Sequence, residues 1–595
     1  MTSLSLRLGR AREQDVAVLL LVLLATWAAF AGVLHNEFVN WDDPDALIRN
    51  AALDGTGLAR WAFTTTHMSH YQPLSWLAWG GWRDLAGVSA RAHHLLSLLA
   101  HAFNAVLVFL LAFRLAEAAG FDARARRASA AAGALLFAVH PLRVEPAAWA
   151  SGFPYLLALA FCLLSALAFL EHARGGGRAW LWASVLFYAL SLLSRPAAPG
   201  FPLVLLALDL VLRRFERERL GRLLVEKVPF ALLAVLATAV EAAARPFVSL
   251  ERIGVGARLA DAVLAPFLYL YRTVWPARLS PLDPLPLDAR LSALALAGGL
   301  ALLVAVTALV WRERRRRPAL AAAWVSYLVL LGPALGLAPS GLQRTADRYT
   351  YFAGVALALV AGAAVGLAGA RRYRRPVLAA AALIVLALTV ATARQVRYWR
   401  DSVTLWTRAV EREPRNDVAL YNLAHALEER GDEAEAVRRY EQTLRLLPDH
   451  APARRNLQRL EARRLEREGN DLAASGRLPE AIAAYSRALE RDPERLHARR
   501  SRGMALAQLG RGREAVPDLR AALEQGPSEP AVVNALAYAL VESGEPAEAT
   551  RVLRDGRRRH PEDDGIARNL ARLQAAEPAE RGRSSHAEKT APAKP

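Results

Sequence analysis

The sequence predicts an all-α chain in which a polytopic membrane domain of about eleven transmembrane helices precedes a solenoid of helical repeats. Hydrophobic residues make up 54% of the 595 residues, and they gather in long runs of Leu, Ala and Val between residues 15 and 395. Residues 396–575 are charged and follow a helical period. Clusters of arginine separate the apolar runs. These observations favour a membrane domain followed by a soluble one.

The first apolar run follows Arg7, Arg10 and Arg12, so we expect a cytoplasmic N-terminus. This run is too long and too rich in leucine for a cleaved signal peptide. The predicted spans cover residues 16–34, 92–114, 129–147, 155–171, 179–194, 199–213, 228–245, 290–311, 318–337, 351–370 and 376–394. Counted in order, they place every arginine cluster inside and the C-terminal domain outside. Residues 259–284 do not fit as a simple crossing, and we predict an interfacial or re-entrant segment there.

The formal charge of +19 is compatible with nucleic-acid binding, but the arginines lie where the positive-inside rule requires them. This placement argues against a nucleic-acid partner. The sequence has a single cysteine, Cys162, which lies inside an apolar run. Because there is only one, an intrachain disulfide and a cysteine-based metal site are excluded. Richness in Ala, Arg and Leu suggests a high-GC bacterium. We therefore expect an integral inner-membrane protein with periplasmic repeats.

Residues 396–575 contain an internal repeat. Prolines recur with a spacing of 34 residues, and glycines mark the turns between helices: Pro414 and Pro448, then Pro493, Pro527 and Pro561, with Gly431, Gly476, Gly510 and Gly544. Small and large residues recur at fixed offsets, which is the tetratricopeptide signature. About eleven extra residues interrupt the array between Pro448 and Pro493. Ser402 to Pro414 is predicted to be the second helix of a degenerate first copy.

These patterns divide the chain into a membrane domain (1–395), a repeat domain (396–575) and a disordered tail (576–595). The concave face of such a repeat array usually binds peptide. We therefore expect a protein or peptide partner on the repeats, although a purely structural spacer remains an alternative.

Two adjacent carboxylates, Asp42 and Asp43, follow the first span in the predicted outer loop 36–90. Two like charges this close raise one pKa, which favours general-base chemistry or metal binding. Two carboxylates alone are too few ligands for a tight cation site, so we expect no obligatory metal, although a divalent metal stays open. The structural alternative is a turn and helix cap, since Asp before Pro is common in loops.

Other polar side chains are predicted at the same outer face: His140 and Glu145, Arg195, and Arg344, Asp347, Arg348 and Tyr349. Polar groups beside spans are costly and therefore carry functional weight. Arginines bind phosphate in a fixed geometry. A lipid phosphate held by arginines beside a carboxylate base would suit sugar transfer from a lipid carrier. Each group also has a structural explanation, such as a helix cap at His140 and Glu145 or a local ion pair between Asp347 and Arg348.

Short motifs between residues 40 and 400 resemble GT-C type glycosyltransferases that use lipid-phosphate sugars. The similarity is strongest to the transmembrane and tetratricopeptide-repeat O-mannosyltransferases and their bacterial relatives. The matching pieces are Phe38–Asp43, Tyr71–Leu74, His93–Leu95, His140–Pro141 with Glu145, Asp347–Tyr351 and Tyr398–Asp401.

This resemblance implies transfer of a sugar, mannose in the characterised relatives, from a polyprenyl phosphate to Ser or Thr of a protein. It implies that Asp42 and Asp43 lie at the active centre and that Arg348 serves the carrier phosphate. One departure is Ser151–Tyr155, where relatives carry a basic residue close to an acidic one. Two alternatives stay open: a non-catalytic membrane-anchored repeat scaffold for envelope complexes, and transfer to a glycan or lipid acceptor.

Overall fold

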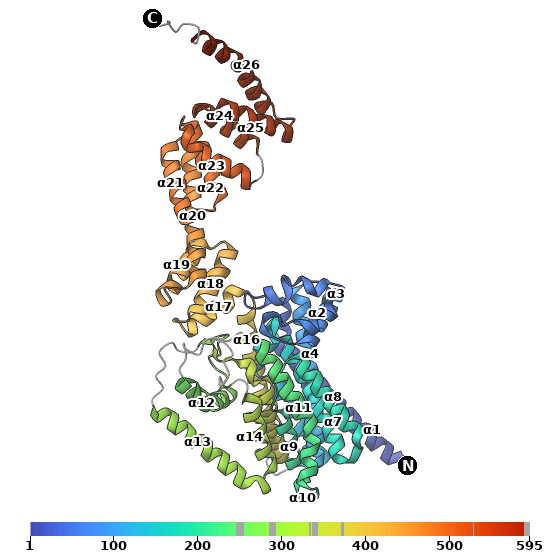
Figure 1. Cartoon of the computed structure of the whole chain (residues 1–595). Coiled ribbons are helices and arrows are strands. Elements are labelled where there is room, and N and C mark those ends of the chain that lie inside the picture. Colours follow the sequence, from blue (N-terminus) through green and yellow to red (C-terminus); the bar gives the residue numbers. More distant parts are fainter. Residues whose placement is uncertain are drawn as a thin grey trace. The chain divides into compact units, whose positions relative to one another are not determined.

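The computed structural model describes residues 2–244, 255–284, 293–332, 335, 343–369, 374–526 and 529–587. The chain forms two compact units, Met1–Ala426 and Leu427–Pro595, which we call the first and second units. Both are helical (Figure 1), and the described residues add one short antiparallel pair, β1 (Asp283–Pro284) and β2 (Gln343–Thr345).

Every predicted span overlaps a helix of the first unit. These helices are α1 (Thr2–Phe30), α4 (Ala90–Ala118), α5 (Ala123–Ala138), α7 (Phe153–Glu171), α8 (Arg178–Ser194), α9 (Phe201–Val211), α11 (Leu220–Ala244), α13 (Ala293–Arg312), α14 (Pro318–Leu331), α15 (Thr350–Gly369) and α16 (Arg374–Val396). Among the described residues, seven segments are long and apolar enough to cross a membrane, around α1, α4, α7, α11, α13, α15 and α16. Helices α8, α9 and α14 are apolar but shorter.

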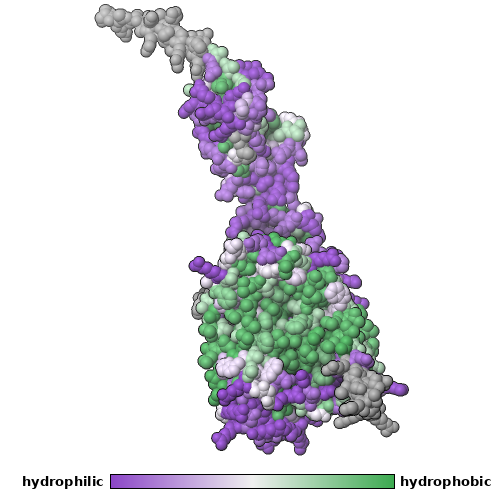
Figure 2. All heavy atoms as spheres, turned by 90° about the vertical axis from the view of Figure 1, so that its right-hand side faces the viewer, coloured by the Kyte–Doolittle hydropathy of each residue, from purple (hydrophilic) through white to green (hydrophobic). Residues whose placement is uncertain are grey.

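The outer surface of these helices is apolar. Leu24, Val235 and Leu383 are each more than 60% exposed (68%, 69% and 67%). Figure 2 shows a broad hydrophobic area over the first unit, with hydrophilic residues along its lower edge. A contiguous apolar surface of this kind marks contact with a membrane or with other protein.

Helix α5 is shorter than the predicted third span, which was expected to run from 129 to 147. It ends at Ala138, and three short pieces follow: η5 (Pro141–Arg143), α6 (Val144–Ala148) and η6 (Ala150–Gly152). Pro141 has no N–H to continue the helical ladder, which explains the break. The broken segment carries Glu145 and Ser151 into the interior of the unit.

The segment predicted to be interfacial or re-entrant contains α12 (Val255–Val274), a helix with one apolar face. Two tyrosines connect it to its neighbours. Tyr269 Oη lies 3.2 Å from the Ala346 carbonyl and 3.0 Å from the Ala346 N–H. Tyr327 of α14 donates to the Pro266 carbonyl at 2.6 Å. Helix α12 is thus attached to the start of the segment that carries Arg348.

Arg214 belongs to an arginine cluster between two predicted spans, and its side chain is buried. It is 4% exposed and lies in α10 (Arg214–Arg217). Its guanidinium pairs with Asp209 at 2.8 Å and with Glu226 at 2.9 Å. Lys227 contacts the same Asp209. This buried ionic cluster joins the end of α9 to α11.

The remaining helices of the first unit are short or lie at its C-terminal end. They are α2 (Leu58–Thr64), α3 (Pro73–Ala86), α17 (Ser402–Arg412) and most of α18 (Asp417–Arg430). The membrane domain was predicted to end at 395, whereas the compact unit continues to Ala426 and includes the first repeat helices.

The second unit continues the repeat with α19 (Glu433–Leu446), α20 (Ala451–Ala474), α21 (Leu478–Arg491), α22 (Leu496–Gln508), α23 (Gly512–Gln525), α24 (Pro530–Glu542), α25 (Pro546–Arg559) and α26 (Asp564–Ala587). The extra residues of the interrupted copy are absorbed by α20, which is 24 residues long. The four turn glycines have positive φ angles of 91°, 76°, 70° and 85°, a conformation that favours glycine after a helix.

The region predicted to be a disordered tail begins inside α26. This helix continues to Ala587, and residues 588–595 lie outside the described residues.

Helices α5 and α15 pack through glycines, which gives a test of the fold. A Cβ on Gly362 would lie 2.4 Å from the Ser129 carbonyl oxygen and 2.6 Å from the Gly133 nitrogen. We expect Gly362→Ala to lower the free energy of unfolding by about 1–3 kcal/mol, because two backbones would have to separate. Thermal unfolding in detergent measures this change. Gly298→Ala in α13 is the control, since its Cβ would meet nothing within 4 Å. Equal melting temperatures for the two variants would show that this packing is wrong.

Candidate functional site

Asp43 is a buried anchor of the loop formed by residues 36–90. Its Oδ2 accepts a hydrogen bond from the Val39 N–H at 2.9 Å. Its Oδ1 accepts from the Ser151 N–H at 2.9 Å and from the Ser151 hydroxyl at 2.5 Å. Burial raises the pKa of the Asp43 carboxyl to about 6, although these hydrogen bonds oppose the shift. Oδ1 therefore holds the loop against the turn before α7, and Oδ2 closes a turn within the loop itself.

Asp42 is the carboxylate that remains available. Its side chain is partly exposed and forms no hydrogen bond or ion pair recorded with the described residues. Burial raises the pKa of the Asp42 carboxyl, and the positive charges of Arg348 and Arg195 oppose this rise. Asp42 therefore interacts electrostatically with two arginines that come from other segments of the chain.

Arg348 is held by a carboxylate and by aromatic rings. Its guanidinium pairs with Glu145, and its backbone N–H donates to the same carboxylate at 2.8 Å. A second guanidinium nitrogen donates to Gln343 Oε1 at 2.7 Å. The guanidinium carbon also lies 5.0–5.7 Å from the ring centres of Trp41, Trp149 and Tyr349. Glu145 therefore balances the charge of Arg348 and fixes its position.

Arg195 differs from Arg348 because its recorded partners carry no formal negative charge. Its guanidinium lies 2.9 Å from Gln72 Oε1, 3.1 Å from His70 Nε2 and 3.3 Å from the Tyr155 hydroxyl. It also lies over the Tyr155 ring, 4.8 Å from its centre. The Tyr155 hydroxyl interacts with both Arg195 and Arg348 and so joins the two. Within the described residues, no carboxylate is in direct contact with Arg195, and the nearest recorded one in this network is Glu241, which pairs with His70 at 2.9 Å.

His140 takes the structural role that the sequence left open. Its Nδ1 accepts from the Leu142 N–H at 3.2 Å and caps η5. The proton is therefore on Nε2, which lies 2.9 Å from the Thr273 carbonyl. His140 joins the end of α5 to α12 and is not placed with Asp42.

Asp347 is buried, and its closest recorded cation is Arg272 rather than the neighbouring Arg348. Asp347 Oδ1 lies 3.6 Å from an Arg272 guanidinium nitrogen. Arg272 also donates to Asp283 at 2.7 Å and to Thr345 at 3.0 Å. The sequence analysis missed Arg272, although an arginine in an apolar helical face is a signal that could have identified it. Arg344 lies in β2, but its side chain is outside the described residues.

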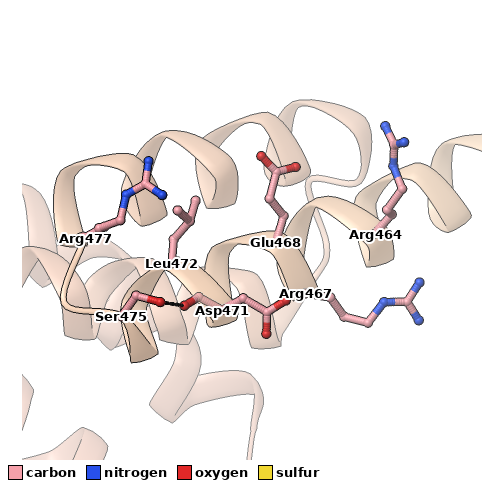
Figure 3. A pocket seen from close by; sticks show the side chains of 7 residues that line it. All are labelled: Arg464, Arg467, Glu468, Asp471, Leu472, Ser475 and Arg477. Carbon is pink, nitrogen blue, oxygen red and sulfur yellow. Dashed lines mark hydrogen bonds between the residues drawn. The ribbon is translucent and has the colours of Figure 1, made fainter.

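A concave region lies in the second unit, on α20 and the turn before α21. This groove has a volume of about 480 Å³ and is lined by Arg464, Arg467, Glu468, Asp471, Leu472, Ser475 and Arg477 (Figure 3). Three of its charged residues already have partners of opposite sign: Arg467 with Glu433, Glu468 with Arg487 and Arg477 with Glu480. The groove therefore offers little unbalanced charge. The described part of the chain contains no group of three His, Cys, Asp or Glu side chains that could hold a metal ion.

Comparison with known proteins identifies the repeats. Tetratricopeptide repeat models match residues 405–438, 466–530 and 506–573. The C-terminal region therefore consists of tetratricopeptide repeats, as the 34-residue period predicts. The chain matches no curated protein.

Solved structures similar to this chain resemble its repeats. YrrB, a TPR protein with an unusual peptide-binding site, is 18% identical and aligns 31% of this chain with 87% of its own, at a TM-score of 0.18. TTC0263, a thermophilic TPR protein of Thermus thermophilus, is 20% identical over 32% and 95% of the two chains, at a TM-score of 0.16. MamA of Desulfovibrio magneticus RS-1 is 16% identical over 27% and 86%, at a TM-score of 0.18. TM-scores this low carry no argument about function.

The burial of Asp43 predicts a pH effect on stability. Its folded pKa of about 6 lies above the value of about 3.9 for an unfolded aspartate. The protonated Asp43 carboxyl therefore makes its full contribution to the free energy of unfolding below about pH 4. This contribution is lost as the pH rises through 6. We expect the melting temperature of wild type to fall relative to that of Asp43→Asn as the pH rises from about 4 to 7. Asp45→Asn, which alters an exposed carboxylate paired with Arg49, is the control. A difference that is the same at every pH would contradict the burial of Asp43.

Proposed function

We propose that this chain is a membrane glycosyltransferase that moves a sugar from a polyprenyl-phosphate carrier to Ser or Thr hydroxyls of proteins. In this proposal the apolar helices cross the inner membrane and the N-terminus is cytoplasmic. The Asp42 site and the repeats then face the periplasm. The exposed apolar surface of the first unit and the arginine clusters between its helices support this orientation.

One observation carries the proposal: a partly exposed carboxylate without a partner among the described residues lies within the electrostatic influence of two arginines. Asp42 is suited to accept the proton of an incoming hydroxyl. The hydroxyl oxygen then bonds to the anomeric carbon of the sugar, and the bond from that carbon to the phosphate oxygen breaks. The phosphate departs with the bonding electron pair. Arg195 and Arg348 stabilise the negative charge that develops on it.

The segment Ser151–Tyr155, where the chain departs from the proteins it resembles, is compatible with these roles of Asp42 and the arginines. Ser151 binds Asp43, and Tyr155 contacts Arg195. The segment lacks the charges expected from the resemblance but still contacts both halves of the candidate site. This contact supports a site that keeps its geometry with a different set of side chains. The donor sugar is mannose if the resemblance extends to the donor.

A non-catalytic scaffold is the second candidate, and the tetratricopeptide repeats favour it. Tetratricopeptide repeats, which the family models identify here, usually bind peptide or protein partners on their concave face. Under the first candidate they present the acceptor protein, whereas under the second they assemble an envelope complex. An available carboxylate beside two arginines has no role in a scaffold, so the effect of changing Asp42 separates the two.

The central test is Asp42→Asn, which preserves the shape of the side chain but removes the base. We expect the transfer rate to fall by about 10²- to 10⁴-fold, the usual contribution of general-base catalysis. The assay follows a radiolabelled sugar from polyprenyl phosphates, mannose first, to proteins of an envelope extract. Asp45→Asn is the matched control, because Asp45 is an exposed carboxylate of the same loop. Full transfer by purified Asp42→Asn protein would exclude the proposed chemistry, and an inactive wild type with every sugar donor would favour the scaffold.

Arg195 gives a separate test of donor binding. We expect Arg195→Gln to raise the donor KM about 10- to 100-fold, because a charged hydrogen bond to phosphate contributes about 1.5–3 kcal/mol. Arg195→Lys keeps the charge but loses the planar fork, so a smaller increase is expected. Inhibition by free polyprenyl phosphate is the second measurement and should weaken in parallel. Arg60→Gln changes an exposed arginine of α2 and serves as control. Unchanged inhibition of Arg195→Gln would remove this residue from the phosphate site.

A further inference from the structure

Asn40, two residues before Asp42, is bound almost entirely by the first repeat helices. Its backbone N–H donates to the Ser402 hydroxyl at 2.9 Å. Its side-chain Nδ2 donates to the Asn422 carbonyl at 3.1 Å. Its Oδ1 accepts from the Trp406 indole N–H at 2.5 Å. These three contacts use one residue of the outer loop and come from α17 and α18, more than 360 positions later in the chain.

Trp41, between Asn40 and Asp42, is held by the same part of the chain. Its ring centre lies 5.3 Å from that of Trp406 and 6.4 Å from that of Trp399. On the membrane-helix side it stacks on Trp149 at 5.0 Å. Trp399 and Trp406 are fully buried, with exposures of 1% and 0%. The Glu37 N–H adds a backbone hydrogen bond to the Arg400 carbonyl at 2.7 Å.

The short stretch from Asn40 to Asp43 is therefore fixed at both ends. Asp43 attaches its far end to Ser151, and Asn40 attaches its near end to α17 and α18. Asp42 lies between the two attachments, and its side chain makes no recorded polar contact with the described residues. The position of its carboxylate therefore depends on its neighbours rather than on its own hydrogen bonds. All of these residues belong to the first compact unit, so the first repeat helices are part of the body that carries the site.

We propose that Asn40 is a positioning residue for Asp42 and that the α17–α18 helix pair is its anchor. This role rests on the proposed glycosyl transfer. It assigns the first repeat helices to the catalytic body, and it leaves acceptor recognition to the repeats of the second unit. Loss of the Asn40 contacts moves the carboxylate relative to Arg195 and Arg348 without changing any residue that touches substrate.

The Trp406 indole N–H allows a conservative test. Trp406→Phe removes the donor to Asn40 Oδ1 but keeps a buried aromatic ring beside Trp41. Trp399→Phe is the matched control, because Trp399 is equally buried and stacks on the same ring. Its indole N–H has no hydrogen bond recorded with the described residues. Both variants lose a similar side-chain volume, but only Trp406→Phe also loses the hydrogen bond to Asn40.

We expect Trp406→Phe and Asn40→Ala each to lower kcat about 10- to 100-fold, because a displacement of about 1 Å in a reacting group has effects of this size. The donor KM should change less than about twofold, since the arginines stay in place. Trp399→Phe should keep kcat within about threefold of wild type if the hydrogen bond, rather than ring volume, is what matters. Adding Trp406→Phe to Asn40→Ala should have little further effect, because the acceptor is already gone.

Hydrogen–deuterium exchange of residues 37–46 is a readout that does not depend on activity. Exchange should rise in Asn40→Ala and Trp406→Phe and stay near the wild-type level in Trp399→Phe. If wild type transfers sugar and all three variants have the same kcat, the positioning role is wrong while the proposed function stands. Equal losses in Trp406→Phe and Trp399→Phe would likewise overturn it, since general packing would then explain the effect. If wild type transfers no sugar, the proposed function itself fails, and the exchange data alone then decide whether Asn40 anchors the loop.

Discussion

The candidate site depends on the buried carboxylate of Asp43. Three donors converge on its two oxygens: the Val39 N–H, the Ser151 N–H and the Ser151 hydroxyl. A backbone loop inside an apolar body is tolerated only where its polar groups find partners, and Asp43 supplies them to a turn 108 residues away in sequence. Because this residue is fixed, the neighbouring Asp42 side chain is left free of the anchoring contacts. The two adjacent acids thus have different roles, one holding the loop and the other remaining available.

The two arginines show the same division. Glu145 forms an ion pair with the Arg348 guanidinium and also accepts a hydrogen bond from the Arg348 backbone N–H. Arg195 is held instead by an amide, an imidazole and a phenol. A guanidinium that already has a carboxylate partner gains less from a phosphate than one that has none, because part of its charge is already compensated. Arg195 is therefore the stronger candidate for direct phosphate contact, and Arg348 contributes mainly its fixed positive field.

Local sequence patterns predicted the helices and the repeats well, because both depend on residues a few positions apart. The spans, the 34-residue period and the turn glycines all have this local origin. The end of α5 at Ala138 was missed, although the sequence His140-Pro141 marks the break. The division between Asp42 and Asp43 depends on Ser151, and the burial of Arg214 depends on Asp209 and Glu226. Composition alone gives no sign of such pairings.

In the proposed reaction, proton transfer to Asp42 and departure of the phosphate are coupled through the arginines. Glu145 pairs with Arg348, and Asp42 interacts electrostatically with Arg348 and Arg195. When the Asp42 carboxylate accepts a proton, its own negative charge is neutralised. In the same step a phosphodiester carrier with one negative charge becomes a phosphomonoester with a second. The proton transfer therefore strengthens the field of the arginines just when the leaving phosphate needs it, and stabilisation falls on the transition state rather than on the bound donor.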